Sequence, residues 1–488
     1  MTDPQRVHKL EYVPSAGSRS SAPRSPSPDT ATEESLFEVE KKIYPRALHG
    51  WFAGWRWGMV WATQLVFYGT AWLEWNGRQA VLFDLAARKF YIFGLVMWPQ
   101  DFIYLTVLLI ISALSLFLFT AVAGRLYCGY ACPQTVYTEI FLWIERKIEG
   151  DRAARMKLDA QPLHARKFGL KTAKHAVWIA LALWTGFTFV GYFTSIRELV
   201  HGVSAATIGP WETFWILFYG FATYGNAGWM REQVCKYMCP YARFQSTMFD
   251  RNTLIITYDN ARGEPRGPRA RQVDPLSKGL GACVDCNICV QVCPTGIDIR
   301  QGLQYECIGC AACIDGCDQV MDKMGYPRGL IRYSTQNALE RGLDKAAIVA
   351  RVFRPRVLIY AGVLACVVAG AGTALWMRLP LKVDVIRDRG VLAREIDGGQ
   401  IENVYRIQLM NIDERAHEFV ISAAGLPGIA IAGADRVVLD GTTTRAVPVR
   451  LQAPSDAGKK GANKIAITVR ATDNAAVSVT EKASFVLP

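Results

Sequence analysis

The chain has few histidines, and this scarcity limits the redox cofactors that it can carry. There are six among its 488 residues, at positions 8, 49, 164, 175, 201 and 417. Haem iron in electron-transfer proteins is held by axial side chains such as histidine. Only His175 lies near an apolar stretch long enough to cross a membrane, and it lies at the edge of that stretch. The sequence therefore argues against a transmembrane haem relay.

Other features are missing as well. No G-x-G-x-x-G fingerprint follows a strand-like run, so we expect no NAD or flavin site and a separate cytosolic electron donor. Residues 1–45 are rich in Ser and Pro and poor in large apolar side chains, which predicts a disordered cytoplasmic tail. This tail lacks the short apolar core of a secretory signal.

Hydrophobic residues make up 51% of the chain and are concentrated in runs. Because a bilayer core of about 30 Å needs roughly 20 apolar residues in a helix, these runs predict a polytopic α-helical membrane protein of about five spans. Four of them lie in a membrane domain, residues 46–250, and the fifth lies in residues 351–380. The runs are 51–75, 102–124, 175–194, 211–228 and 357–377.

The charge of the connecting segments predicts the orientation of these spans. Segments 125–174 and 229–356 are rich in Lys and Arg, whereas 195–210 carries only Arg197. Basic segments stay on the cytoplasmic side, so the N-terminus is expected there and the end of the chain in the periplasm of a bacterial inner membrane. The net charge of +12 is therefore explained by topology, and lipid rather than nucleic acid is the expected partner.

Residues 381–488 contain short runs of alternating apolar and polar residues, separated by Gly, Asp, Asn and Pro. Examples are "VYRIQLMNI", "HEFVISA" and "NKIAITVRA". Several such runs over about 100 residues are typical of an immunoglobulin-like β-sandwich. We find no catalytic constellation in this predicted periplasmic domain.

Cysteine is concentrated in the middle of the chain. Residues 283–293 read "CVDCNICVQVC" and residues 307–317 read "CIGCAACIDGC", so both have the spacing C-x-x-C-x-x-C-x-x-x-C. Two such runs in tandem predict a cytoplasmic ferredoxin-like module with two [4Fe–4S] clusters over residues 251–350. Zinc sites are the alternative, but zinc more often takes paired C-x-x-C knuckles separated by longer loops.

The fourth thiolate of each cluster in two-cluster ferredoxins comes from the other motif. This rule predicts that one cluster binds Cys283, Cys286, Cys289 and Cys317, and that the other binds Cys307, Cys310, Cys313 and Cys293. The second motif departs from the usual pattern, because its last cysteine precedes Asp318 and not proline. We expect a different local turn there.

Two further cysteine pairs share the spacing C-x-x-x-C-P. They occur in "CGYACP" and "CKYMCP", each after a pair of predicted spans, which indicates an internal repeat of a helical hairpin. On a continuous helix the two thiols of a pair lie on one face, about 5–6 Å apart at Cβ, which suits two ligands of one metal better than a disulfide. The four residues, a candidate redox and metal site, are Cys128, Cys132, Cys235 and Cys239.

The proline of each motif suggests a role for the cysteine before it. Proline is favoured at the first position of a helix, so Cys132 and Cys239 are expected at helix N-caps, where the thiolate is stabilised. Thiolates are soft ligands suited to Cu(I), and Met238 would add a thioether. The alternative is that all four are small buried residues at a membrane boundary.

Two residues in the spans are unusual. Arg56 interrupts the first span, and we expect it to reach the membrane surface or to pair with a carboxylate such as Glu74. Cys366 lies in the fifth span and is expected to be an inert buried residue.

In this order of spans, paired motifs, cluster motifs and β-domain, the chain resembles the FixG/CcoG (RdxA) family of accessory proteins for cbb3-type cytochrome c oxidase. The resemblance implies an oxidoreductase that reduces Cu(II) to Cu(I) for delivery to the oxidase. Electrons would pass from a cytosolic donor through two [4Fe–4S] clusters to transiently bound copper near the paired motifs. Copper transport and oxidase assembly proteins would be its partners.

Two other functions are compatible with the sequence. The first four spans with both C-x-x-x-C-P motifs also resemble NapH-type quinol dehydrogenase subunits, which lack the β-domain, so a quinol-oxidising electron-transfer subunit is one alternative. A non-enzymatic scaffold, whose β-domain recruits oxidase assembly partners, is the other.

Overall fold

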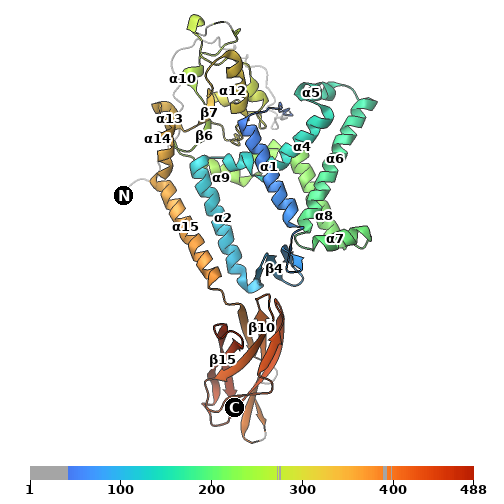
Figure 1. Cartoon of the computed structure of the whole chain (residues 1–488), viewed down its shortest axis with the longest axis vertical. Coiled ribbons are helices and arrows are strands. Elements are labelled where there is room, and N and C mark those ends of the chain that lie inside the picture. Colours follow the sequence, from blue (N-terminus) through green and yellow to red (C-terminus); the bar gives the residue numbers. More distant parts are fainter. Residues whose placement is uncertain (1–41, 272, 274–275, 388–392, 397) are drawn as a thin grey trace, which may run out of the picture. The chain divides into compact units, whose positions relative to one another are not determined.

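The computed structural model of the chain describes residues 42–271, 273, 276–387, 393–396 and 398–488 (Figure 1). Two units are distinguished, Met1–Lys42 and Ile43–Pro488, and the second contains all the elements named below. The predicted tail, residues 1–45, therefore lies outside the described residues except at its end. There the Tyr44 hydroxyl donates a hydrogen bond of 2.6 Å to Asp159, which holds the chain in place before the first helix.

Helices lie at all five positions where the sequence predicts spans. Three are long and apolar enough to cross a membrane: Pro99–Ala123, which comprises η1 (Pro99–Asp101) and α2 (Phe102–Ala123), then α6 (Ala165–Val190) and α15 (Pro355–Trp376). The others are α1 (Trp51–Thr70) and α8 (Pro210–Thr223), which the π-helix η2 (Tyr224–Met230) extends. Because α1 carries an arginine and α8 has 14 residues, the span count of five stays a prediction.

Further helices follow each helical hairpin. After α2 come α3 (Leu126–Tyr130), α4 (Pro133–Glu149) and α5 (Arg152–Ala160). After η2 come the π-helix η3 (Val234–Met238) and α9 (Pro240–Met248). Each C-x-x-x-C-P motif thus lies between the end of a helical hairpin and a helix that begins at the proline of the motif, as the internal repeat predicts.

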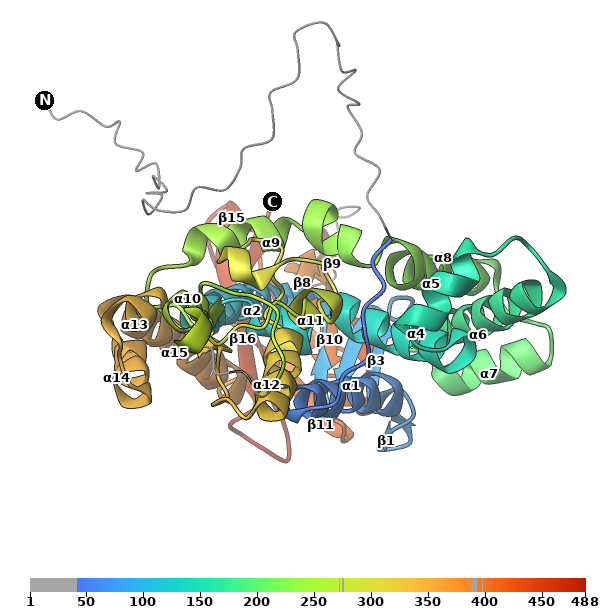
Figure 2. The same ribbon diagram turned by 90° about the horizontal axis from the view of Figure 1, so that it is seen from above.

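The long helices pack in two groups. A Cβ on Gly186 of α6 would lie 2.4 Å from the carbonyl oxygen of Ile216 in α8, so glycine allows these helices to approach closely. Since α4 also packs against α6, the three lie together in Figure 2. Helix α15 packs instead against α2. Cys366 of α15 is exposed in the described part of the chain, so its predicted burial is wrong.

The connection between α1 and α2 folds into two small sheets that the sequence analysis did not predict. Strand β1 (Glu74–Trp75) pairs with β2 (Arg78–Gln79), and β4 (Lys89–Ile92) pairs with both β3 (Val81–Asp84) and β5 (Leu95–Met97). Helix α7 (Ile196–Ser204) begins beside them, and its Arg197 forms an ion pair with Glu74. The prediction that Glu74 pairs with Arg56 is therefore wrong.

The ferredoxin-like module lies between α9 and α15. Its two strands, β6 (Ile255–Tyr258) and β7 (Ile331–Ser334), are antiparallel, with Ile256 opposite Tyr333. Its helices are α10 (Asn260–Gly263), η4 (Leu276–Lys278), α11 (Ile288–Gln291), η5 (Ile299–Gln301), α12 (Ala312–Met324), α13 (Gln336–Arg341), α14 (Lys345–Ala350) and η6 (Arg351–Phe353). The strands bring together the two ends of the segment that holds both cluster motifs.

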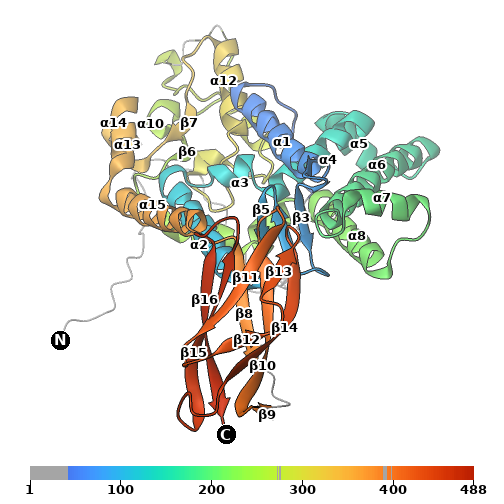
Figure 3. The same cartoon turned by 60° about the horizontal axis from the view of Figure 1, so that its bottom comes forward.

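The C-terminal residues form two antiparallel sheets, which confirms the predicted immunoglobulin-like sandwich (Figure 3). One sheet contains β8 (Leu381–Arg387), β9 (Arg394–Ile396), β10 (Gln400–Asn411), β12 (Ala430–Ala432) and β14 (Thr444–Pro454). The other contains β11 (His417–Ala424), β13 (Arg436–Leu439), β15 (Gly461–Ala471) and β16 (Ser478–Leu487). Tyr405, Phe419 and Phe485 are fully buried in the core between them.

Candidate metal centres

The eight cysteines of the ferredoxin-like module lie in two sets of four. Burial raises the pKa of Cys313, and the nearby thiols Cys310, Cys307 and Cys293 raise it further. We call these four the Cys307 set. The pKa of Cys317 is raised to about 12, first by burial and then by Cys289, Cys283 and Cys286, which complete the Cys283 set. Each fourth thiol thus lies near cysteines of the other motif, but Cys289 also lies near Cys313, and the assignment of four ligands to each cluster stays a prediction.

The two cluster motifs have the same backbone turns. Asp285 and Gly309 have φ of 54° and 69°, and Asn287 and Ala311, two positions later, have φ of 55° and 59°. Helices α11 and α12 begin directly after them. As expected from the missing proline, the motifs differ at their ends, because Cys317 lies within α12.

The Cys307 set surrounds a space with apolar walls. Cys289 and the four thiols of this set line a cavity of about 320 Å³ with isoleucine side chains. The backbone N–H groups of Gly309 and Ala312 hydrogen-bond to Cys307 and Cys310. Hydrogen bonds to cysteine sulfur are a recurring feature of iron–sulfur sites, so these residues fit a [4Fe–4S] cluster. Burial raises the pKa of Cys307 to about 12, so metal binding has to displace its proton.

The four thiols of the C-x-x-x-C-P motifs also come together. We call them the paired-motif thiols: Cys128, Cys132, Cys235 and Cys239. The pKa of Cys235 is raised to about 12, first by burial and then by the nearness of Cys132, Cys128 and Cys239. All four side chains are partly buried. Two hairpins far apart in the sequence therefore contribute to one group of thiols.

The two motifs share an unusual backbone path. The N–H of Cys132 donates to Tyr127 O at 3.0 Å, and the N–H of Cys239 donates to Val234 O at 2.8 Å. Both are bonds to the fifth residue back. The prediction that each pair lies on one face of a continuous helix is therefore wrong, since the helix widens and then breaks within the motif.

The predicted N-caps are confirmed. Cys132 is the N-cap of α4 and Cys239 is the N-cap of α9. Burial raises the pKa of Cys132, while hydrogen bonds from the backbone of Thr135 and Gln134 lower it, as a helix N-terminus should. Burial thus opposes the low thiol pKa that the sequence predicts. Met238 is 58% exposed, whereas the four thiols are partly buried.

Contacts between the repeats hold the paired-motif thiols together. Gln134 of the first motif donates to the carbonyl oxygens of Asn226 and Arg231, at 2.9 and 3.0 Å. The thiol of Cys128 donates to Gln245 Oε1 of α9, at 3.4 Å. These are side-chain bonds from one repeat to the other, so the sulfur atoms meet where the hairpins interlock.

Four residues before the first cysteine, each motif makes the same turn. Gly124 has φ 55° and ψ −121°, and Arg231 has φ 43° and ψ −113°. This conformation is costly for a residue with a Cβ. Arg231 is held by a hydrogen bond of 2.8 Å from its guanidinium to Glu145 of α4, which is fully buried. An ion pair therefore stabilises in the second repeat a turn that glycine permits in the first.

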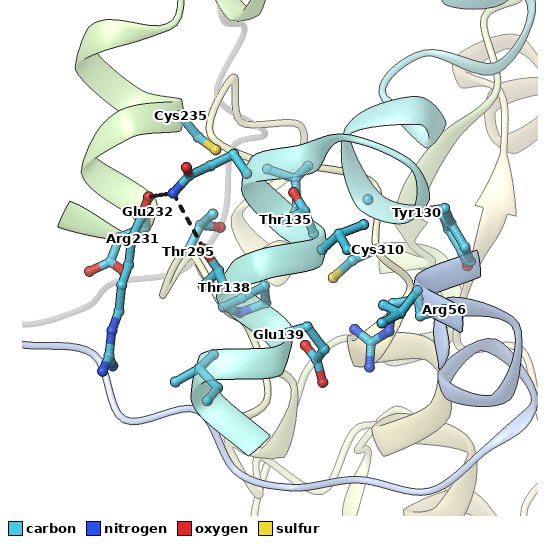
Figure 4. A pocket seen from close by; sticks show the side chains of 17 residues that line it. Arg56, Tyr130, Thr135, Thr138, Glu139, Arg231, Glu232, Cys235, Thr295 and Cys310 are labelled. Atoms are coloured by element: carbon cyan, nitrogen blue, oxygen red, sulfur yellow. Dashed lines mark hydrogen bonds between the residues drawn. The ribbon is translucent and has the colours of Figure 1, made fainter. Parts of the chain in front are cut away.

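The first paired motif lies directly against the ferredoxin-like module. A Cβ on Gly129 would lie 2.8 Å from Cα of Cys310, and a Cβ on Gly309 would lie 3.0 Å from the carbonyl oxygen of Arg125. Each segment therefore needs glycine where it meets the other. A pocket beside this contact is lined by both Cys235 and Cys310 (Figure 4). The Cys307 set is thus adjacent to the paired-motif thiols.

Among the described residues, no group of three His, Cys, Asp or Glu side chains is placed to hold a single metal ion. The paired-motif thiols would have to move closer together to hold one copper ion.

Sequence reasoning missed Gly129 and the partners of Arg56. Arg56 of α1 lies close to Cys310 and Glu139 and not to Glu74. The sequence did contain one signal for this contact. Both "CGYACP" and "CIGC" have a glycine between two cysteines, and these glycines, Gly129 and Gly309, lie where the two segments pack together.

Comparison with known protein families agrees with this organisation. A family model described as a 4Fe-4S dicluster domain matches residues 230–336, and another described as a 4Fe-4S binding domain matches residues 105–150. A third, which describes the Ig-like fold at the C-terminus of FixG, matches residues 371–488. The first paired motif lies within the match at 105–150.

Several curated proteins are similar to the chain. It is 40% identical to "Nitrogen fixation protein FixG" of Rhizobium meliloti over 437 residues, which covers 83% of each chain. It is 39% identical to "Protein RdxA" of Cereibacter sphaeroides over 430 residues, which covers 86% of this chain and 89% of the relative. "Ferredoxin-type protein NapH" of Haemophilus influenzae is 21% identical over 232 residues, 44% of this chain and 68% of that protein.

Proposed function

Since the chain belongs to the FixG and Rdx family, an iron–sulfur electron-transfer family, we propose that it reduces Cu(II) to Cu(I) to assist assembly of a cbb3-type cytochrome c oxidase. The observation that carries this proposal is the contact of Gly129 with Cys310, which places the paired-motif thiols beside the Cys307 set. Electrons delivered to that set then have a short path to the thiols.

The ligand assignment follows the two sets of thiols. The Cys283 set holds one [4Fe–4S] cluster and the Cys307 set holds the other, and each cluster supplies one-electron transfer when it is bound. Cys286 is exposed, whereas Cys310 is buried. The Cys283 set is therefore the side on which a soluble donor docks, and the Cys307 set passes electrons inward.

Copper is the substrate at the paired-motif thiols. Thiolates are soft ligands that favour Cu(I) over Cu(II), so binding there pulls the reduction forward. Copper binding draws the four sulfur atoms together and displaces the thiol protons of Cys128 and Cys235, whose pKa values burial raises. Interlocked hairpins that approach from both repeats allow such a closure without unfolding either one.

We place the ferredoxin-like module on the cytoplasmic side of the inner membrane and the β-sandwich in the periplasm. The support is the excess of Lys and Arg in segments 125–174 and 229–356. Electrons then come from a cytosolic donor, and the reduced copper passes to copper transport or oxidase assembly proteins.

The experiment is to reduce the purified protein without oxygen, add Cu(II), and follow cluster reoxidation by absorbance. We expect rapid reoxidation in the native protein and a loss of at least tenfold in rate when all four paired-motif cysteines are changed to serine. The matched control is Cys366→Ser, which removes an exposed thiol outside the three sets. Equal rates in native protein and the fourfold variant would refute the role of these thiols.

A quinol-oxidising subunit is the second candidate, and the match to NapH over 232 residues favours it. Reduction of the oxidised clusters by a ubiquinol or menaquinol analogue, with no reoxidation by Cu(II), is its signature. A scaffold without redox activity predicts instead that serine substitutions in the Cys307 set leave oxidase maturation unchanged.

The match of a 4Fe-4S binding domain to residues 105–150 raises a further question about what the paired-motif thiols hold. Iron analysis of the protein before copper is added answers it. Two clusters give eight iron atoms per chain, and iron above that number that disappears in the fourfold serine variant would assign these thiols to iron.

A further inference from the structure

Arg56 is the only charged side chain of α1, and it lies against the Cys307 set. Its guanidinium is close enough to the Cys310 thiol for a hydrogen bond. Its Nε is buried with no hydrogen-bond partner among the described residues. Figure 4 shows the guanidinium beside the Glu139 carboxylate, both of them next to the Cys310 sulfur. Burying a cation in an apolar helix costs free energy, so Arg56 beside a predicted cluster ligand is a candidate functional residue.

The two sets of thiols have different charged neighbours. Near the Cys307 set are Arg56 and also Arg125, which lies close to Cys307. Near the Cys283 set, Arg300 approaches Cys289 but is bound by Asp298 and Asp285, at 2.6 and 2.5 Å. Asp318 lies close to Cys317 of the same set. Two arginines and one carboxylate, Glu139, therefore lie beside the Cys307 set, whereas beside the Cys283 set Arg300 is paired with two aspartates and Asp318 adds negative charge.

Charge beside a cluster changes its reduction potential. Reduction adds one negative charge, which a nearby cation stabilises, and this attraction is strong where little water screens it. A hydrogen bond to a ligand sulfur acts in the same direction. Arg56 supplies both to Cys310. The arginines near the Cys283 set bond to other groups: Arg300 to Asp298 and Asp285, and Arg269 to the backbone oxygen of Cys283 at 3.2 Å.

We propose that Arg56 raises the reduction potential of the cluster in the Cys307 set. Electrons then move from the cluster in the Cys283 set toward the paired-motif thiols. This rests on the proposed function, because it requires that both sets hold [4Fe–4S] clusters. Arg56 does not touch the substrate. It acts through Cys310 and sets the direction of transfer.

Glu139 acts against Arg56. Its carboxylate lies near both Arg56 and Cys310, and it is also 3.7 Å from Arg146. Removing the charge of Glu139 leaves the Arg56 guanidinium less neutralised beside Cys310, which should raise the reduction potential of the cluster in the Cys307 set. The same physical account therefore predicts opposite shifts for substitutions at two neighbouring residues, which a loss of packing alone would not produce.

The test is potentiometric EPR of the full-length protein in detergent, with iron analysis of each variant. We expect Arg56→Gln to lower the midpoint of one cluster by at least 59 mV, which is a tenfold change in electron partition for a one-electron couple, and to leave the other unchanged. Arg56→Lys should restore part of the shift, and Glu139→Gln should raise the same midpoint. The control is Arg197→Gln, an exposed arginine paired with Glu74, which should shift neither.

The results separate this inference from the proposed function. Native protein without two [4Fe–4S] signals would refute the cluster assignment itself. Full iron content with unchanged midpoints in Arg56→Gln and Glu139→Gln would overturn the role of Arg56 while leaving that assignment intact. Equal shifts of both clusters, or shifts of the same sign in the two variants, would also overturn it. If the Arg56→Gln variant does not assemble its clusters, the midpoints of Arg56→Lys and Glu139→Gln decide whether Arg56 has this role.

Discussion

Gly129, in the first paired motif, lies so close to Cys310 of the ferredoxin-like module that a Cβ there would be 2.8 Å from the Cys310 Cα. No side chain fits in this space, and the obstacle is backbone that cannot rotate away. The first paired motif and the Cys307 set therefore meet through main chain, which fixes the distance between them more firmly than a contact of flexible side chains would.

Substitution of Gly129 tests this contact. We expect Gly129→Ala to push the two segments apart, to destabilise the protein by about 1–3 kcal/mol as overpacking does, and to slow cluster reoxidation by Cu(II). Stopped-flow absorbance measures the rate, and iron analysis shows that both clusters remain. The matched control is Gly54→Ala in α1, where an added Cβ meets nothing within 4 Å. Equal rates in the two variants would show that the contact does not control transfer.

The buried pair of Arg231 and Glu145 should stabilise the second paired motif. Glu145 also lies 3.4 Å from the buried Arg155, so Glu145→Gln leaves two buried arginines without their carboxylate, and we expect it to lower the free energy of unfolding by about 3 kcal/mol. Thermal unfolding of the protein in detergent measures this effect. The double variant with Arg231→Gln should cost less than the sum of the single changes.

An exposed pair is the control for that comparison. Arg436 and Glu418 lie 3.7 Å apart with side chains 64% and 38% exposed, so Glu418→Gln should change stability by less than about 1 kcal/mol. Additive effects of Arg231→Gln and Glu145→Gln would contradict the coupling.

The crossing of cluster ligands between motifs is tested with paired serine variants. Cys317→Ser should remove one cluster and about half of the iron, and adding Cys283→Ser should remove no more, because both belong to the Cys283 set. Adding Cys307→Ser to Cys317→Ser should instead remove both clusters. Iron analysis and EPR report the outcome, and Cys366→Ser is the control. The reverse result would mean that each motif supplies all four of its own ligands.

His417 makes the stability of the β-sandwich depend on pH. Burial lowers its pKa, but hydrogen bonds to Asp413 and Asp473, at 3.1 and 2.7 Å, raise it above the usual value. A raised pKa in the folded state means that this contribution is present below the unfolded pKa of about 6.5 and is lost as pH rises through the folded pKa.

We therefore expect native protein to resist proteolysis of the β-sandwich better than His417→Gln at pH 5.5, and the difference to shrink at pH 8.5. Comparison of the two proteins at each pH removes the pH dependence of the protease. The effect is about 1 kcal/mol at most, since the two aspartates are partly exposed. A difference that grows with pH would contradict this sign.

Patterns with strong local causes could be predicted from the sequence. Tandem spacing indicated the ferredoxin-like module, alternation indicated the β-sandwich, and proline placed Cys132 and Cys239 at N-caps. Each of these depends on a few neighbouring residues or on a rule of chain geometry.

Features that depend on contacts between distant segments were missed. The small strands between α1 and α2 are fixed partly by Gln79, whose side chain donates to Gly191 O and accepts from the Ile196 N–H. The break inside each C-x-x-x-C-P motif and the position of Arg56 beside Cys310 likewise follow from packing of one repeat or module on another. The hydrophobic pattern of a segment does not predict which distant segment it will contact.

The most direct test of the central claim is X-ray absorption at the copper edge after one equivalent of Cu(II) is added to the reduced protein without oxygen. The account predicts Cu(I) with sulfur ligands in the native protein and in Cys366→Ser, and the loss of sulfur ligation when the four paired-motif cysteines are serine. Copper that stays Cu(II), or that is reduced but bound only by nitrogen and oxygen in the native protein, would contradict it.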